Sequence, residues 1–149
     1  MKAAVKAGDA KRLAELIMQD PGFEVNKVPK GDSFNLLHSA CRGDSRSPVL
    51  PLLLAHPYID VNVRDEAGNT PFMFACWNGF TSCVCELLKD PRVQLSLADY
   101  EGRPPIRVAA YCGRLEVIRW WIASGREMDL GTPGYFSKSD AIRGQRREA

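Results

Sequence analysis

Thiols, imidazoles and carboxylates are the side chains of this sequence that could do chemistry. The closest thiols are Cys83 and Cys85, which are separated by one residue. A structural zinc site takes four ligands, and no second pair of Cys or His residues lies at a suitable spacing from this pair. We therefore expect Cys83 to lie in the core, Cys85 to face outward, and no metal to be bound.

The histidines and carboxylates form no catalytic arrangement that we recognise. The sequence contains none of the motifs of a serine hydrolase, a zinc protease or a phosphate-binding loop. Carboxylates are spread along the chain without an evident pair, and His56 stands alone before Pro57. The sequence thus predicts a protein that is not an enzyme and that uses no cofactor.

Composition and charge are those of one globular domain. The 149 residues carry a formal net charge of +2, and 45% of them are hydrophobic. So small a charge predicts no long-range attraction to nucleic acid. The chain shows no secretory signal, no disulfide spacing among its five cysteines and no apolar run long enough to span a membrane. We expect a soluble cytoplasmic protein that binds neither nucleic acid nor membrane.

An internal repeat runs through the chain. Similar segments start at Asp20, His56 and Asp90, so the intervals are 36 and 34 residues. Each follows a stretch whose apolar residues recur three, four and seven apart, the pattern of an amphipathic helix. A fourth stretch of this kind lies at residues 117–122. A shorter helix precedes each of the four, with a small residue on its buried face. The small residues are Ala4, Ala40, Ala75 and Ala109. A period of this length is typical of a solenoid, in which each unit buries its apolar face against its neighbours.

Two stretches of the repeat carry a recognisable motif. Residues 65–75, DEAGNTPFMFA, are followed by Gly79, and residues 99–109, DYEGRPPIRVA, are followed by Gly113. Both resemble the ankyrin repeat pattern D-x-x-G-x-T-P-L-H-x-A-x-x-x-G. The resemblance implies an all-α ankyrin-repeat solenoid of stacked helix-turn-helix units joined by hairpin loops. We place an N-terminal unit at residues 1–30, repeats at 31–64, 65–98 and 99–132, and an incomplete unit at 133–149.

The residue types of the motif have physical roles. Gly68 and Gly102 suit a positive φ at a hairpin tip, and Thr70 can cap the helix that follows. Pro104 replaces this threonine in the next repeat, so we expect a weaker helix start there. The resemblance assigns His38 to hydrogen bonds that tie neighbouring hairpins together.

Three further segments lead to predictions. Residues 43–48 hold one residue more than the matching segment of the next repeat, which predicts an exposed loop. Cys41 and Cys76 each follow the small alanine of a short helix, which predicts core positions. Of the adjacent tryptophans, Trp121 matches the buried position of Leu87, and Trp120 is expected to be more exposed.

The end of the chain resembles a repeat without its second helix. Residues 137–149 look like a first helix with Ser137 or Ser139 as its cap. We expect apolar surface near Trp121 and Ile122 to be less well covered, and our hypothesis is a truncated chain. A group of basic residues near the end of the chain has two interpretations. It contacts phosphate or an acidic partner, or it is a solvated helix face. Its members are Arg143, Arg146 and Arg147.

The resemblance also implies a binding surface. Partners of ankyrin proteins usually dock on the concave side, which is made from hairpin tips and the ends of first helices. The matching positions here are Asp32, Phe34, Arg42, Glu66, Asn69, Trp77, Asn78, Tyr100, Arg103, Tyr111 and Cys112. Trp, Tyr and Arg are over-represented among binding hot spots, so we expect a protein or peptide partner.

Two alternative functions stay open at this point. The chain is either a unit that self-associates through its incomplete C-terminal end, or an accessory domain of a larger ankyrin-containing protein. Repeat folds host many specificities, so the sequence does not name the partner.

Overall fold

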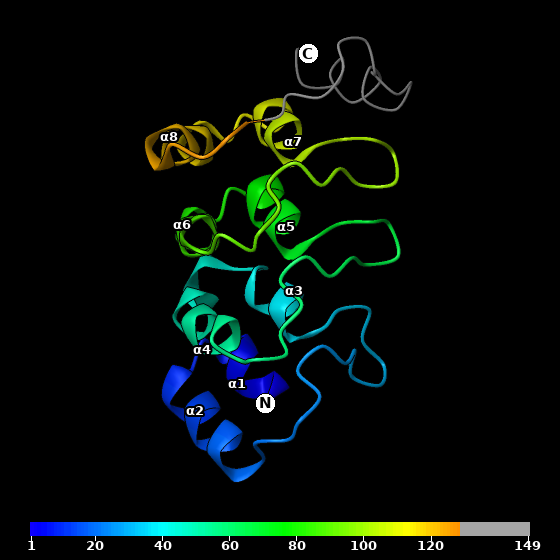
Figure 1. The fold of residues 1–149 in the computed structure, drawn as a ribbon, viewed down its shortest axis with the longest axis vertical. Coiled ribbons are helices and arrows are strands. Elements are labelled where there is room, and N and C mark those ends of the chain that lie inside the picture. Colours follow the sequence, from blue (N-terminus) through cyan, green and yellow to red (C-terminus); the bar gives the residue numbers. More distant parts are fainter. Residues whose placement is uncertain (129–149) are drawn as a thin grey trace.

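Stacked helix pairs make up the protein in the computed structural model, which describes residues 1–128. Within these residues the pairs are α1 (Lys2–Ala7) with α2 (Ala10–Gln19), α3 (Leu36–Ala40) with α4 (Leu50–Leu54), α5 (Pro71–Asn78) with α6 (Thr81–Lys89), and α7 (Pro105–Tyr111) with α8 (Leu115–Ser124). Figure 1 shows them as one column, with the loops that connect one pair to the next projecting to the same side. This architecture confirms the predicted helical solenoid. The expected incomplete unit at 133–149, its helix at 137–149 and the basic group at its end lie outside the described residues.

In each pair we call the first helix (α1, α3, α5 or α7) the inner helix and the second (α2, α4, α6 or α8) the outer helix. The starts of the inner helices follow the residue types of the motif. The Thr70 hydroxyl accepts a hydrogen bond from the backbone N–H of Met73 at 3.2 Å, and the Asn35 side chain accepts one from the N–H of His38 at 2.9 Å. Pro104 precedes α7 without a side-chain cap, as expected. A side-chain oxygen at this position satisfies one of the free N–H groups of the first helical turn. The helix starts are therefore encoded locally.

Residues 43–48 connect α3 to α4 and also contact the next repeat. Our prediction of an exposed loop there was wrong in part. They begin a 3-10 turn, Asp44–Val49, in which Asp44 and Ser45 are exposed but Arg46 is half-buried. Arg46 Nη1 donates to the carbonyl oxygen of Ser39 at 2.8 Å, and Asp44 Oδ1 accepts from the N–H of Ser82 at 3.0 Å. The end of one helix and the start of another have unpaired backbone groups, and this segment supplies partners for both.

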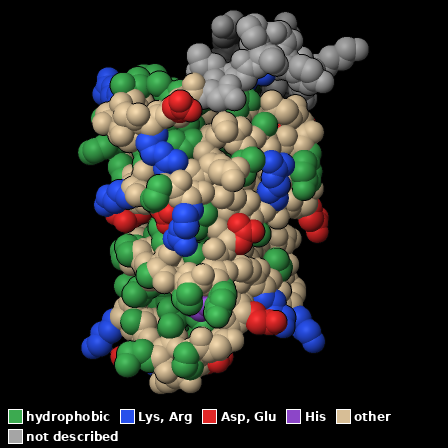
Figure 2. Space-filling model, in the orientation of Figure 1, with side chains coloured by type: hydrophobic (Ala, Val, Ile, Leu, Met, Phe, Trp, Pro, Cys, Tyr) green, Lys and Arg blue, Asp and Glu red, His purple; other side chains and the backbone are tan. Residues whose placement is uncertain are grey.

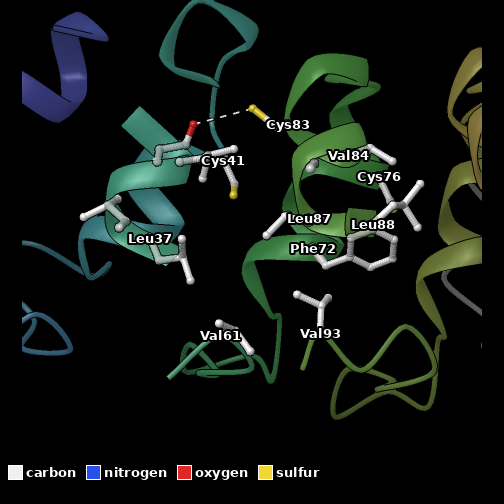
Figure 3. Packing of buried hydrophobic residues seen from close by; sticks show 14 of the residues in the cluster. Leu37, Cys41, Val61, Phe72, Cys76, Cys83, Val84, Leu87, Leu88 and Val93 are labelled. Carbon is white, nitrogen blue, oxygen red and sulfur yellow. Dashed lines mark hydrogen bonds between the residues drawn. The ribbon is translucent and has the colours of Figure 1, made fainter. Parts of the chain in front are cut away.

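The core runs the length of the described stack between inner and outer helices. Figure 3 shows part of it, from Leu37 to Val93. Cys41, Cys76 and Cys83 are buried in it as predicted, and Cys85 is half-buried. The Cys83 thiol donates to the carbonyl oxygen of Ala40 at 3.7 Å, which joins adjacent repeats. Burial raises the pKa of Cys83 to about 12, because desolvation disfavours the thiolate. These thiols therefore act as packing groups.

Asparagines join the loops of successive repeats. Asn26 Nδ2 donates to the carbonyl oxygen of Tyr58 at 2.6 Å, while its Oδ1 accepts from the N–H of Asp60 at 2.8 Å. Asn62 repeats the arrangement one unit later, with the carbonyl oxygen of Arg92 at 2.9 Å and the N–H of Gln94 at 2.8 Å. One amide group can donate and accept at once, so it can bridge two backbones. These bridges fix the spacing of the loops.

The C-terminal end of the described structure is partly covered. Trp121 is fully buried, with its ring 5.1 Å from that of Phe72 and its indole N–H donating to the carbonyl oxygen of Glu127 at 3.1 Å. Our prediction that its surroundings are poorly covered was therefore wrong for Trp121. Ile122, in contrast, is 59% exposed, and Trp120 is 50% exposed. Adjacent helix positions point in different directions, so one tryptophan enters the core and the other does not.

Candidate partner-binding surface

The loop tips and the C-terminal ends of α3, α5 and α7 hold the predicted surface residues. Arg42, Glu66, Asn78, Tyr100 and Tyr111 are exposed. The half-buried members are Asp32, Phe34, Trp77, Arg103 and Cys112. Asn69 is the exception at 6% exposure.

Asn69 is a structural residue of the loop between the second and third helix pairs. Its side-chain amide donates to Asp65 Oδ2 at 3.2 Å, and its backbone carbonyl accepts from His38. A side chain held under the surface offers little area to a partner. Asn69 is therefore not part of the exposed surface.

Trp77 and Arg103 form the centre of the remaining surface. The Arg103 guanidinium carbon lies 5.8 Å from the centroid of the Trp77 ring, a cation–π distance. Arg103 Nε donates to Asp99 Oδ2 at 2.7 Å, and the side chain of Asp99 is almost fully buried. Arg114 Nε donates to the backbone carbonyl oxygen of Trp77 at 2.9 Å. Two residues of the repeat that follows Trp77 thus position the stacked pair. Asp99 binds the side chain of Arg103, and Arg114 binds the backbone of Trp77.

A second stacked pair lies one repeat earlier. The Arg42 guanidinium carbon is 4.7 Å from the centroid of the Phe34 ring. Phe34 in turn meets Phe74 at 5.2 Å with the rings nearly perpendicular, a favourable edge-to-face contact. Phe74 and Trp77 are three residues apart on α5 and so share one side of the helix. Phe74 therefore lies between the Arg42–Phe34 pair and the Trp77–Arg103 pair and connects them.

Phe74 also belongs to this surface, although we did not predict it from the sequence. It occupies the variable position of the motif, between the histidine position at Met73 and Ala75. An apolar residue at a variable position, one helical turn before Trp77, is the signal that could have identified it.

His38 lies beneath this aromatic group and has a structural role. Its Nε2 is 2.9 Å from the carbonyl oxygen of Asn69, and its Nδ1 is 3.0 Å from Asn35 Oδ1. The first contact confirms the predicted hydrogen bond between neighbouring repeats. Burial lowers the pKa of His38, while the hydrogen bond to Asn69 and the charge of Asp65 oppose this shift. An imidazole that is fixed between two repeats supports the loop above it.

Tyr100 positions the next loop. Its N–H donates to the carbonyl oxygen of Ala67 at 3.0 Å, and the Arg64 guanidinium carbon lies 5.5 Å from its ring centroid. Gly68 has a φ of +83°, and a Cβ atom there would stand 2.7 Å from the Tyr100 backbone nitrogen. Only glycine allows this close approach of one loop tip to the next.

Two other kinds of feature, a metal site and a membrane-spanning helix, were sought within residues 1–128. In this range no group of three or more His, Cys, Asp and Glu residues is placed to hold a metal ion. None of the helices described is long and apolar enough to cross a bilayer. The feature that distinguishes the described surface is the row of aromatic and arginine side chains.

Comparisons with known proteins cover most of the chain. The family model for ankyrin repeats, in three copies, matches residues 1–99 and again residues 37–132. Human SMC5-SMC6 complex localization factor protein 1 is 42% identical over 90 residues, which are 60% of this chain and 8% of that protein. The probable E3 ubiquitin-protein ligase XBOS31 of Oryza sativa subsp. japonica is 32% identical over 116 residues, 78% of this chain and 25% of that protein.

Further matches have the same character. Palmitoyltransferase AKR1 of Saccharomyces cerevisiae is 29% identical over 110 residues, which are 72% of this chain and 13% of that protein. The chain thus spans a quarter or less of each of these relatives. A crystal structure of the ankyrin repeat protein EF0377 superposes with a TM-score of 0.70 at 21% identity, over 85% of this chain and 61% of that one. The repeat motifs, the stacked helix pairs and the family match agree, and the chain belongs to the ankyrin repeat family.

Proposed function

We propose that this chain is a non-enzymatic binding module that takes a protein or peptide partner on the aromatic–arginine strip. The strip is defined here as Phe34, Arg42, Phe74, Trp77, Arg103 and Tyr111. The observation that carries the proposal is the pair of Arg–aromatic stacks, at 4.7 Å and 5.8 Å, that lie one repeat apart.

Rigid aromatic and arginine side chains are suited to binding for a physical reason. They bury a large area with few rotatable bonds, so little conformational entropy is lost when a partner immobilises them. The ion pair of Arg103 with Asp99 fixes the guanidinium before any partner arrives. A surface that is organised in advance spends less binding energy on ordering itself.

A role inside a larger assembly is consistent with the relatives. In the human localization factor, in XBOS31 and in AKR1 the matching part is a small fraction of the protein. We infer that a segment of this kind serves such proteins by recruiting a partner, while other parts supply the activity that their names describe. The same recruiting role, without turnover, is our proposal for this chain.

Replacement of one tryptophan tests the strip. Trp77→Ala should weaken binding by about 2 kcal/mol, the scale of a hot spot, and leave the helical content unchanged. Trp120→Ala is the matched control, because Trp120 is 50% exposed on the outer helix α8. Proteins would be captured from a lysate with each immobilised variant and quantified by mass spectrometry. A set of captured proteins that depends equally on both tryptophans, or on neither, would contradict the proposal.

A further inference from the structure

The outer helix α8 exposes an apolar stripe at the end of the described stack. Leu115, Ile118 and Ile122 follow one another at intervals of three and four residues, so they share one side of the helix. Leu115 is 64% exposed and Ile122 is 59% exposed. Figure 2 shows apolar side chains on the surface around α8. Side chains of this size gathered at a surface mark an interaction site.

The preceding repeat shows what kind of structural element covers the equivalent surface. Ile122 is equivalent to Leu88 of α6, which is 7% exposed because α8 packs against α6. Ala110 of α7 is exposed, whereas the equivalent Cys76 of α5 is fully buried where α7 packs against α5. The end face that α7 and α8 present therefore has the chemistry of a face that a stacked helix pair covers.

The opposite end of the stack has a different character. The exposed side chains of α1 and α2 include Met18, at 81% exposure, but also Lys6, Lys11, Arg12 and Glu15, and Arg12 pairs with Glu15 at 3.1 Å. A contact between this end and α8 would place charges against apolar side chains and remove them from water. The surface that matches the α8 stripe best is another apolar stripe.

We propose that α8 binds the α8 of a second copy of this chain, in an antiparallel pair about a two-fold axis between Ile118 and Arg119. Leu115 and Ile122 lie equally far along the helix from that point. Each leucine therefore opposes the isoleucine of the other copy. Glu116 and Arg119 pair at 2.6 Å within one chain, beside the apolar stripe. In this arrangement Glu116 also comes within one helical turn of Arg119 of the other copy, so opposite charges flank the apolar contact. A two-fold interface requires a surface that is complementary to itself, and this stripe meets the requirement.

The pairing leaves the aromatic–arginine strip free. The strip lies on the inner helices and loop tips, while α8 is an outer helix (Figure 1). A dimer joined at α8 would present two strips, and two linked sites raise the apparent affinity for a partner that carries two binding segments. The dimer is thus a separate property from binding at the strip and does not depend on it.

Sedimentation velocity over a roughly hundredfold range of protein concentration tests the proposal, because self-association follows mass action. The wild type should shift from monomer to dimer as concentration rises. Ile122→Glu should weaken the dimer by at least about 100-fold, because both copies lose a buried side chain and gain a charge. Met18→Glu is the matched control, since Met18 is 81% exposed on α2 at the other end. It should dimerise as the wild type does.

Other outcomes overturn the proposal. A wild type that stays monomeric at every concentration would overturn it. If Ile122→Glu then also lowered the melting temperature of this monomer, the result would indicate that residues 129–149 of the same chain cover the stripe. Equal loss of dimer in Ile122→Glu and Met18→Glu would place the contact elsewhere. Circular dichroism of each variant confirms folding, and Leu115→Gln provides an independent disruption of the same stripe.

Discussion

Replacement of Gly68 by alanine tests whether the close approach of loop tips holds the repeats together. A Cβ atom at Gly68 would stand 2.7 Å from the backbone nitrogen of Tyr100 and 2.7 Å from its ring. Backbone cannot move aside as the end of a side chain can. The N–H of Tyr100 also donates to the carbonyl oxygen of Ala67, so a shift of Tyr100 strains the hydrogen bond between the two loops.

Two costs add in this variant. A residue with a Cβ at a φ of +83° costs about 1–2 kcal/mol, because Cβ approaches the following carbonyl oxygen. Forced overlap with packed atoms adds about 1–3 kcal/mol. We expect a loss of about 3 kcal/mol in the free energy of unfolding, which corresponds to a fall in melting temperature of about 6–12 °C for a chain of this size.

Gly113→Ala separates the two costs. Gly113 has a φ of +67°, and a Cβ there would meet nothing within 4 Å, so this variant should lose the backbone part alone. Urea and thermal unfolding would be followed by circular dichroism for both variants. If the two lost the same stability, the contact between Gly68 and Tyr100 would contribute nothing and our reasoning on the loop tips would fail.

Three further predictions concern titration, capping and thiol reactivity. Burial lowers the pKa of His38 in the folded state. Its contribution to stability is therefore present above the unfolded pKa of about 6.5 and is lost as pH falls below that value toward the lower folded pKa. The urea midpoint should fall between pH 7 and pH 5.5 less steeply in His38→Gln than in the wild type. Asp44→Ala should cost about 1 kcal/mol, because Asp44 caps α6 at the N–H of Ser82, and parallel unfolding curves with the wild type would contradict this role. In native protein at pH 8, Cys83, with its pKa near 12, should react with a thiol reagent far more slowly than Cys85, and comparable rates would contradict its burial.

Local features of the fold could be predicted because each depends on a few neighbouring residues. Thr70 and Asn35 cap helices through their own side chains, and Gly68 and Gly102 have positive φ at loop tips. The period of the repeat indicated stacking, since short helices are marginal alone. The tie between His38 and the next repeat came from the family resemblance and was confirmed.

Contacts between repeats could be predicted less well. The segment that starts at Asp44 looked like an exposed loop because its polar residues give no sign of their distant partners, Ser39 and Ser82. Asn69 looked available to a partner, yet it is buried. Phe74 was missed because a variable motif position carries no expectation until the neighbouring ring of Phe34 is known.

The sequence by itself determined the helix pairs, their caps, the period and hence the stack, since these follow from residue types within one or two turns and from a pattern that recurs. Tertiary structure alone decided which polar side chains bridge repeats, which aromatic side chains meet and that Trp121 is buried beside Phe72. The physical reason is distance along the chain. Contacts between residues more than 30 positions apart, such as Asn62 with Gln94, depend on the relative placement of whole repeats, which no local preference encodes.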